Sequence, residues 1–128
     1  ISNLYTKINS IDEFNDPNEV KVIVDKNGFA IYFSREPIPS RKKGYDVVPM
    51  YKQVCTIPFR RDFLLEFNKM SQTDLEIIES IDMNRIIENG KKVKMIYAEE
   101  DSISVDTKED LARASKNMEN DPLLKSYL

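Results

Sequence analysis

AIYFSREPIP, residues 30–39, begins as a strand and ends as a rigid bend. The first four residues are apolar or aromatic, which favours a strand covered on both faces. Pro37 and Pro39 lack a backbone donor and push the residue before each of them towards extended geometry, so the chain after Arg35 is expected to form a fixed elbow. Arg35 therefore stands where a buried strand meets a rigid loop.

The position of Arg35 permits two interpretations. A guanidinium is a planar fork that matches the geometry of a carboxylate or a phosphate, so Arg35 would suit an anionic ligand. Alternatively, Arg35 pairs with a carboxylate of the protein itself. From the strand alone, the internal pair is the favoured interpretation.

A hairpin is predicted immediately before this bend. Residues 20–24 and 29–33 are two apolar runs, and Asp25-Lys26-Asn27-Gly28 joins them. Asn-Gly between β-branched runs is the strongest short-range hairpin signal in a sequence. Lys21 falls within the first run and is expected to be a solvated side chain on an edge strand.

Further elements follow from hydrophobic periodicity and capping residues. Thr73 and Glu76 form a capping box that opens a helix, and Asn89-Gly90 supplies its stop. The pattern predicts strands over residues 1–8, 51–58 (a central strand) and 92–98, a helical turn over 10–14, and helices over 60–70, 73–89 and 107–118. Residues 120–128 are expected to pack loosely. The chain is therefore predicted to be an α/β protein with a mixed sheet.

Composition excludes several classes of protein. The 128 residues are 41% hydrophobic and 32% charged, which is ordinary for a soluble globular domain, and no segment is long and apolar enough to span a bilayer. A net charge of −3 argues against a general nucleic-acid binder. The only cysteine, Cys55, lies in an apolar run and suits a reducing compartment. Because the chain has no histidine, a metal site would have to be a hard cation held by carboxylates.

One segment of this acidic chain is basic. Residues 35–61 contain seven Lys or Arg and two acids, a local net charge of +5. Such an excess suits an anionic small molecule. For residues 41–43 (RKK), a solvated loop tip is an equally good interpretation.

Four motifs in register resemble one enzyme family. They are FSR followed by PIP within residues 33–39, KQVCTIPFR at 52–60, LEIIES at 75–80 and VDTKEDL at 105–111. This order resembles the bacterial 3-deoxy-manno-octulosonate (Kdo) cytidylyltransferases, also called CMP-Kdo synthetases. The resemblance extends from about residue 16 to residue 111.

The resemblance implies a fold and an activity. It implies the C-terminal part of a nucleotide-diphospho-sugar-transferase-like, Rossmann-like three-layer fold. Residues 1–128 would be the sugar-binding and dimerisation half of one domain, with the N-terminal nucleotide-binding half absent, so the chain alone is expected to be inactive. The whole enzyme would be a cytoplasmic homodimer that uses CTP and Mg²⁺ to activate a sugar acid for lipopolysaccharide or other surface-polysaccharide synthesis, without nucleic-acid or membrane partners.

The resemblance also assigns site residues. Arg35 would face the sugar acid, Gln53 and Asp82 would contact it, and Asp106 of the VDT motif would bind Mg²⁺. Gln53 stands where the family has histidine, and Asp82-Met83 stands where it has Glu-Gln. Ile57 replaces a tyrosine. These departures put the identity of the sugar in doubt, and a CMP-acylneuraminate-type synthetase is an alternative.

Other interpretations stay open from the residues alone. Asp106 could instead be the N-cap of the following helix, and either Asp106 with Glu109 or Thr107 with Asp110 would form that cap equally well. Residues 60–89 have the outline of a helix-turn-helix, but the acidic second helix would repel phosphates. A non-catalytic, self-associating α/β module is a further possibility.

Overall fold

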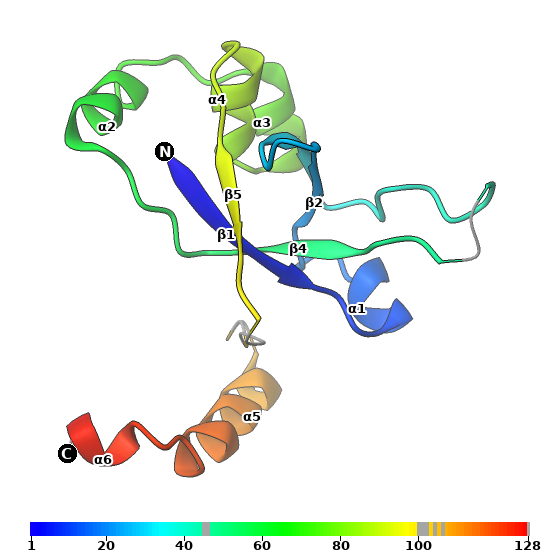
Figure 1. Ribbon diagram of the computed structural model, residues 1–128, viewed down its shortest axis with the longest axis vertical. Coiled ribbons are helices and arrows are strands. Elements are labelled where there is room, and N and C mark those ends of the chain that lie inside the picture. Colours follow the sequence, from blue (N-terminus) through cyan, green and yellow to red (C-terminus); the bar gives the residue numbers. More distant parts are fainter. Residues whose placement is uncertain (45–46, 100–102, 104, 106, 128) are drawn as a thin grey trace.

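The structure, a computed structural model, describes residues 1–44, 47–99, 103, 105 and 107–127. Figure 1 shows that the last helices, α5 and α6, lie away from the sheet. In chain order the elements are β1 (Ser2–Lys7), α1 (Ile11–Asn15), β2 (Lys21–Val24), β3 (Ala30–Ser34), β4 (Tyr51–Val54), α2 (Arg61–Phe67), α3 (Asp74–Glu79), α4 (Met83–Glu88), β5 (Lys94–Tyr97), α5 (Lys108–Glu119) and α6 (Leu124–Tyr127).

The five strands form one mixed sheet in the order β3-β2-β4-β1-β5. β1 pairs with β5 in parallel and with β4 in antiparallel orientation, and β2 pairs antiparallel with β3 and β4. The predicted α/β class and mixed sheet are therefore confirmed. β4 is central, as expected, but it ends at Val54, and Cys55 beyond it is exposed instead of lying within an apolar strand.

The core lies between the sheet and the helices α2 to α4. Its buried side chains are Val22, Phe33, Phe67, Ile81, Met83, Ile86, Val93 and Met95. Val22 and Phe33 are cross-strand partners on β2 and β3. Each fully buried apolar side chain of this size contributes about 1.5–3 kcal/mol relative to an exposed one, so this cluster is the main source of stability.

β3 is an edge strand, and the prediction that it is covered on both faces was wrong: Ile31 is 54% exposed. The Asn84 side chain of α4 covers the open edge. Its Oδ1 accepts from the Phe33 N–H at 3.3 Å, and its Nδ2 donates to the Phe33 carbonyl at 3.0 Å. The amide thus replaces a neighbouring strand and protects an otherwise unpaired edge.

The predicted hairpin is present, and its turn docks against β5. Phe29 forms an antiparallel bridge with Lys94, and the Met95 N–H donates to the Gly28 carbonyl at 2.8 Å. The Lys94 ammonium donates to the Asn27 carbonyl at 2.7 Å. The hairpin tip therefore closes over the strand at the far edge of the sheet.

Gly28 is expected to be sensitive to substitution. Its φ is +77°, and a Cβ there would lie 2.9 Å from Lys94 Nζ. Gly28→Ala should lower the free energy of unfolding by roughly 1–2 kcal/mol in urea titrations, from left-handed strain plus the displaced lysine. Gly90→Ala is the matched control, because φ is +69° with open space around the Cβ. Equal losses in both variants would show that the contact with β5 contributes nothing.

The helix predicted over residues 73–89 is two helices, α3 and α4. Ser80 between them adopts a left-handed conformation, with φ 54° and ψ 47°. This turn directs the carbonyls of Glu79 and Ser80 towards the Arg35 side chain, which donates to both. The break between α3 and α4 therefore coincides with hydrogen bonds to Arg35, a residue more than forty positions earlier in the sequence.

The remaining helices follow their capping residues. Ser10 caps α1 through its side chain, and Thr107 caps α5 together with Asp110. No residue of α5 is buried. None of the helices in the described ranges is long and apolar enough to cross a membrane.

Candidate functional site

The Arg35 guanidinium is held by main-chain carbonyls at the end of β3. Nε donates to the Glu79 carbonyl at 2.8 Å, one terminal nitrogen donates to the Pro17 carbonyl at 2.8 Å, and the other donates to the Ser80 carbonyl at 3.3 Å. These acceptors come from two segments that flank the strand end. The guanidinium is therefore fixed in position by the fold.

The acceptors of the Arg35 guanidinium are neutral carbonyls, although the nearby Glu79 carboxylate interacts electrostatically with its charge. In the described part of the chain, no ion pair joins this guanidinium to a carboxylate. Three of the five guanidinium N–H groups are used, so two are left to donate to a ligand. Of the two interpretations from the sequence, this geometry matches the fixed cation rather than the internal ion pair.

The Glu79 carboxylate ties α3 to the end of β3. It accepts from the Tyr32 hydroxyl at 2.7 Å, the Ser34 hydroxyl at 2.9 Å and the Arg35 N–H at 2.8 Å. Burial alone would raise the pKa of the Glu79 carboxyl, but these hydrogen bonds hold it below its ordinary value. Burial and the bond to Glu79 raise the pKa of Tyr32 to about 12. Glu79 thus fixes the backbone that carries Arg35.

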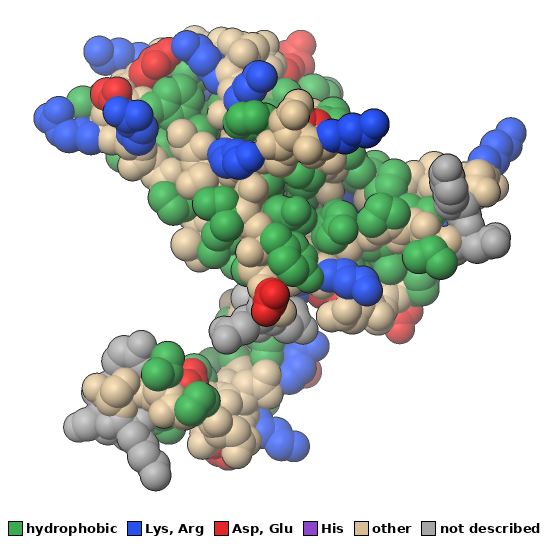
Figure 2. Space-filling view, in the orientation of Figure 1, with side chains coloured by type: hydrophobic (Ala, Val, Ile, Leu, Met, Phe, Trp, Pro, Cys, Tyr) green, Lys and Arg blue, Asp and Glu red, His purple; other side chains and the backbone are tan. Residues whose placement is uncertain are grey.

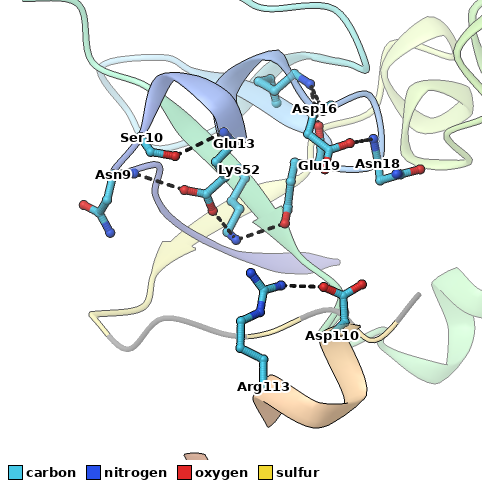
Figure 3. A network of polar contacts seen from close by, with 10 residues as sticks. Asn9, Ser10, Glu13, Asp16, Asn18, Glu19, Lys52, Asp110 and Arg113 are labelled. Carbon is cyan, nitrogen blue, oxygen red and sulfur yellow. Dashed lines mark hydrogen bonds and ion pairs between the residues drawn. The ribbon is translucent and has the colours of Figure 1, made fainter. Parts of the chain in front are cut away.

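Two lysines are buried beside this strand end. Lys21, predicted to be solvated, is wholly buried and donates to the carbonyls of Asp16 and Glu19 at 2.7 and 2.6 Å. The Lys52 ammonium pairs with Glu13 at 2.5 Å and Glu19 at 3.3 Å (Figure 3). The prediction for Lys21 was wrong because the loop before β2 folds back and offers its carbonyls to the ammonium.

Burial perturbs the ionisation of this group. It lowers the pKa of the Lys21 ammonium, although nearby carboxylates act in the opposite direction. Burial also raises the pKa of the Glu19 carboxyl, against the lowering effect of Lys52. Burial therefore disfavours the charged form of both groups, and the hydrogen bonds of the Lys21 ammonium hold the loop that also supplies the Pro17 carbonyl to Arg35.

The basic segment 35–61 does not form one patch. Lys52 is buried and paired, and Arg60 is exposed beside Asp62 at 3.8 Å. Residues 41–43 are exposed, in agreement with a solvated loop tip. Lys43 lines a largely apolar cavity of about 390 Å³ with Pro39, Ser40, Val47, Val48 and Pro49. Of these basic residues, Arg35 is the one that the fold positions with donors to spare.

Gln53 lies on β4, and its N–H donates to the Val20 carbonyl at 2.8 Å. β2 separates it from β3, so it lies roughly 10 Å, or two strand spacings, from the end of the strand that carries Arg35. Gln53 pairs with Tyr5 of β1, which in turn pairs with Tyr97 of β5. Tyr5 and Tyr97 were not predicted as site residues, because only strand register brings them to Gln53.

Asp82 follows the turn that holds Arg35. It is exposed, and the Ser80 carbonyl two residues earlier accepts from the guanidinium. Asp82 lines a cavity of about 400 Å³ with Gln72, Glu76, Ile77, Ser80 and Ile81. Met83 is wholly buried in the core, and Ile57 packs against that core. The structure thus brings Arg35 and Asp82 to one turn and places Gln53 across β2.

Asp106 lies outside the described residues. Thr107 is the N-cap of α5: its hydroxyl accepts from the Asp110 N–H at 3.1 Å, and its N–H donates to Asp110 at 3.0 Å. Of the capping arrangements open from the sequence, α5 uses the one that does not require Asp106. The described ranges contain no group of three metal-ligating side chains.

Comparison with known proteins places these features in a family. A family profile described as "Cytidylyltransferase" matches residues 1–95. The chain is 39% identical over 125 residues to the 3-deoxy-manno-octulosonate cytidylyltransferase of Geotalea uraniireducens, covering 90% of this chain and 50% of that protein. It is 40% identical over 111 residues to the enzyme of the same name from Fusobacterium nucleatum, covering 87% and 45%.

A solved structure has the same fold. CMP:2-keto-3-deoxy-manno-octonic acid synthetase complexed with CTP superposes with a TM-score of 0.80 at 27% identity, over 92% of this chain and 48% of that one. The chain therefore spans about half the length of the relatives that it matches.

Proposed function

This chain belongs to the cytidylyltransferase family, and from that premise we propose that it forms part of an enzyme that joins a 2-keto-3-deoxy sugar acid to CMP. The reaction uses CTP and releases pyrophosphate, and the product supplies lipopolysaccharide or another surface polysaccharide. The guanidinium of Arg35, fixed by three carbonyls with two N–H groups to spare, is the observation that carries this proposal. We also place the enzyme in the cytoplasm, since a single free cysteine, Cys55, suits a reducing compartment.

Arg35 holds the carboxylate that 2-keto sugar acids share. Its two remaining N–H groups can donate to an anion, and charge-assisted bonds of this kind are about twice as strong as neutral ones. Because the guanidinium is fixed before the ligand arrives, little entropy is lost in orienting it. Arg35 thereby positions the sugar oxygen that attacks the α-phosphate, and positioning is the main contribution of a protein to such transfers.

Gln53 and Asp82 bond the hydroxyl or amino groups of the sugar. Ile57 and Met83 pack in or against the core and offer no hydrogen bond, where the resembled family has polar side chains. This change favours a deoxy, amino-substituted or acylated sugar acid over unmodified Kdo. A CMP-acylneuraminate-type synthetase is the second candidate for the same reason.

Asp106 provides one carboxylate for Mg²⁺, and the other ligands come from substrate oxygens and from residues outside the described part of this chain. The ion would neutralise charge on the triphosphate and on pyrophosphate as it leaves. Since Thr107 caps α5, the Asp106 side chain is not needed for that cap.

Substrate preference tests the proposal. A protein of the relatives' length that contains this chain should form CMP-sugars from Kdo, from its amino analogue and from N-acetylneuraminate with different kcat/KM values, the modified acids being preferred. A preference for unmodified Kdo would show that Gln53, Ile57, Asp82 and Met83 do not define specificity. Failure to form any CMP-sugar would contradict the proposal as a whole.

The enzyme is also proposed to be a homodimer. Ile77 and Ile78 of α3 are 62% and 75% exposed, and we take them as the candidate contact between the two subunits. Sedimentation should show a dimer, and Ile78→Asp should raise its dissociation constant at least about tenfold, because an unpaired charge would be buried. Val47→Asp, at an 86% exposed position, is the control. A wild-type protein that is monomeric at tens of micromolar would contradict the prediction, because weak interfaces typically have dissociation constants in that range.

A further inference from the structure

Three tyrosines from three strands meet on one face of the sheet. The rings of Tyr5 on β1 and Tyr51 on β4 are 5.3 Å apart, and those of Tyr5 and Tyr97 on β5 are 5.4 Å apart. Tyr51 and Tyr97 are 6.5 Å apart, and all three pairs pack edge to face. Because Tyr5 is opposite Gln53 in the antiparallel pair, this tyrosine cluster lies directly beside Gln53.

The cluster stands at the edge of the sheet where ligands bind in α/β folds. Tyr5 and Tyr97 lie near the carboxyl ends of the parallel strands β1 and β5, and ligands of α/β sheets bind outside such ends. The chain then continues from Tyr97 towards Asp106 in sequence. The tyrosine cluster is therefore bounded by Gln53 on one side.

The hydroxyls of the cluster are not used in hydrogen bonds within the described ranges, and Tyr97 is the exposed member, since Tyr5 and Tyr51 are partly buried against the core. No hydrogen bond joins Tyr5, Tyr51 or Tyr97 through its hydroxyl to another residue in the described ranges, and Tyr97 is 48% exposed. Burial, followed by the neighbouring Tyr51 and Tyr97, raises the pKa of the Tyr5 hydroxyl. Tyr5 is therefore protonated at neutral pH and able to donate.

We propose that Tyr5, Tyr51 and Tyr97 form a wall of the sugar-acid site beside Gln53 and select an acid whose end distal to the carboxylate carries an acyl group. The inference rests on the proposed function and names the substrate feature that the site selects. Tyrosine combines an apolar ring with a polar tip, so it can cover an acyl methyl while its hydroxyl bonds the amide.

Tyr97 is the position at which to test the wall, because its exposure limits the structural effect of truncation. In the relatives'-length protein, Tyr97→Ala should lower the ratio of kcat/KM for N-acetylneuraminate to kcat/KM for Kdo about tenfold, the effect of losing a small apolar contact. Tyr97→Phe keeps the ring and should stay within about threefold of the wild type, the value of one hydrogen bond. Ile96→Ala is the matched control, since Ile96 is the neighbouring residue on the opposite face and is 46% exposed.

The possible results distinguish the tyrosine wall from a failure of the wall and from a failure of the proposed function. A lower ratio in Tyr97→Ala and an unchanged ratio in Ile96→Ala support the wall. An unchanged ratio in Tyr97→Ala, with circular dichroism showing a folded protein, overturns it, as does a wild type that uses unmodified Kdo alone. If Tyr97→Ala does not fold, Tyr97→Leu takes its place under the same criterion. A wild type that forms no CMP-sugar contradicts the proposed function itself.

Discussion

Glu76→Ala is expected to lower the free energy of unfolding by about 3 kcal/mol, the lower end of the range for breaking a buried ion pair. The Glu76 carboxylate bonds both Nε and a terminal nitrogen of Arg85, and it also accepts from the Thr73 N–H at 3.3 Å. The Arg85 guanidinium in turn lies 4.4 Å from the centre of the Phe67 ring. The variant therefore leaves a cation unpaired where α2, α3 and α4 meet. Arg85 keeps 14% of its side chain exposed, so the lower end of the range applies.

The ion pair between Glu76 and Arg85 should also be detectable in the pH dependence of the free energy of unfolding. Hydrogen bonds from Arg85, which outweigh burial, hold the pKa of the Glu76 carboxyl below its ordinary value of 4.5. A lowered carboxyl pKa contributes stability above pH 4.5 and loses it as the pH falls through the folded-state value. Urea titrations from pH 7 to pH 3 should therefore show a steeper loss in the wild type than in Glu76→Ala.

Glu66→Ala is the control for this prediction. Glu66 pairs with Lys91 at 3.0 Å, but both side chains are about half exposed, so the loss should be under about 1 kcal/mol. A loss in Glu76→Ala no larger than in Glu66→Ala would show that the pair with Arg85 does not hold the helices together.

Arg35→Lys is expected to reduce kcat/KM for the sugar acid about 100-fold in the relatives'-length protein, equivalent to about 2.7 kcal/mol. An ammonium cannot donate to the carbonyls of Pro17, Glu79 and Ser80 and also form a fork with a carboxylate. The loss should appear mainly in KM for the sugar acid, with KM for CTP changed little. Initial rates of pyrophosphate release at varied concentrations of each substrate measure both.

Arg60→Lys is the matched control, because Arg60 is 83% exposed and pairs only loosely with Asp62. Thermal unfolding of both variants separates binding from stability. If Arg35→Lys raised KM for both substrates equally, Arg35 would be a structural residue that joins β3 to α3.

Local signals in the sequence predicted most of the elements. Asn27-Gly28 marked the hairpin, and Ser10, Thr73 and Thr107 marked the starts of α1, α3 and α5. Each of these depends on residues within a few positions of one another, so local chemistry was sufficient. The four family motifs then led to the correct fold class.

The errors arose where distant segments meet. Periodicity continued through Ser80, but the helix breaks there, where Arg35 bonds two carbonyls. Lys21 is charged in a strand and was therefore expected in solvent, yet a loop satisfies its ammonium.

The tyrosine cluster could not be predicted for the same reason, because strand pairing alone brings its members together. Tyr5, Tyr51 and Tyr97 are far apart in the sequence, and no spacing rule relates them. Apolar side chains also gather over the middle of the face shown in Figure 2. These features depend on register, which one sequence does not specify.

Pyrophosphate release is the measurement that tests the account most directly. The relatives'-length protein, given CTP, Mg²⁺ and an acylated or unmodified 2-keto-3-deoxy sugar acid, should release pyrophosphate in equal amount to CMP-sugar, and only when the acid is present. The 128-residue chain alone should release none, because its three glycines form no phosphate-binding pattern. Sugar-dependent pyrophosphate release by the isolated chain, or none by the longer protein, would contradict the account.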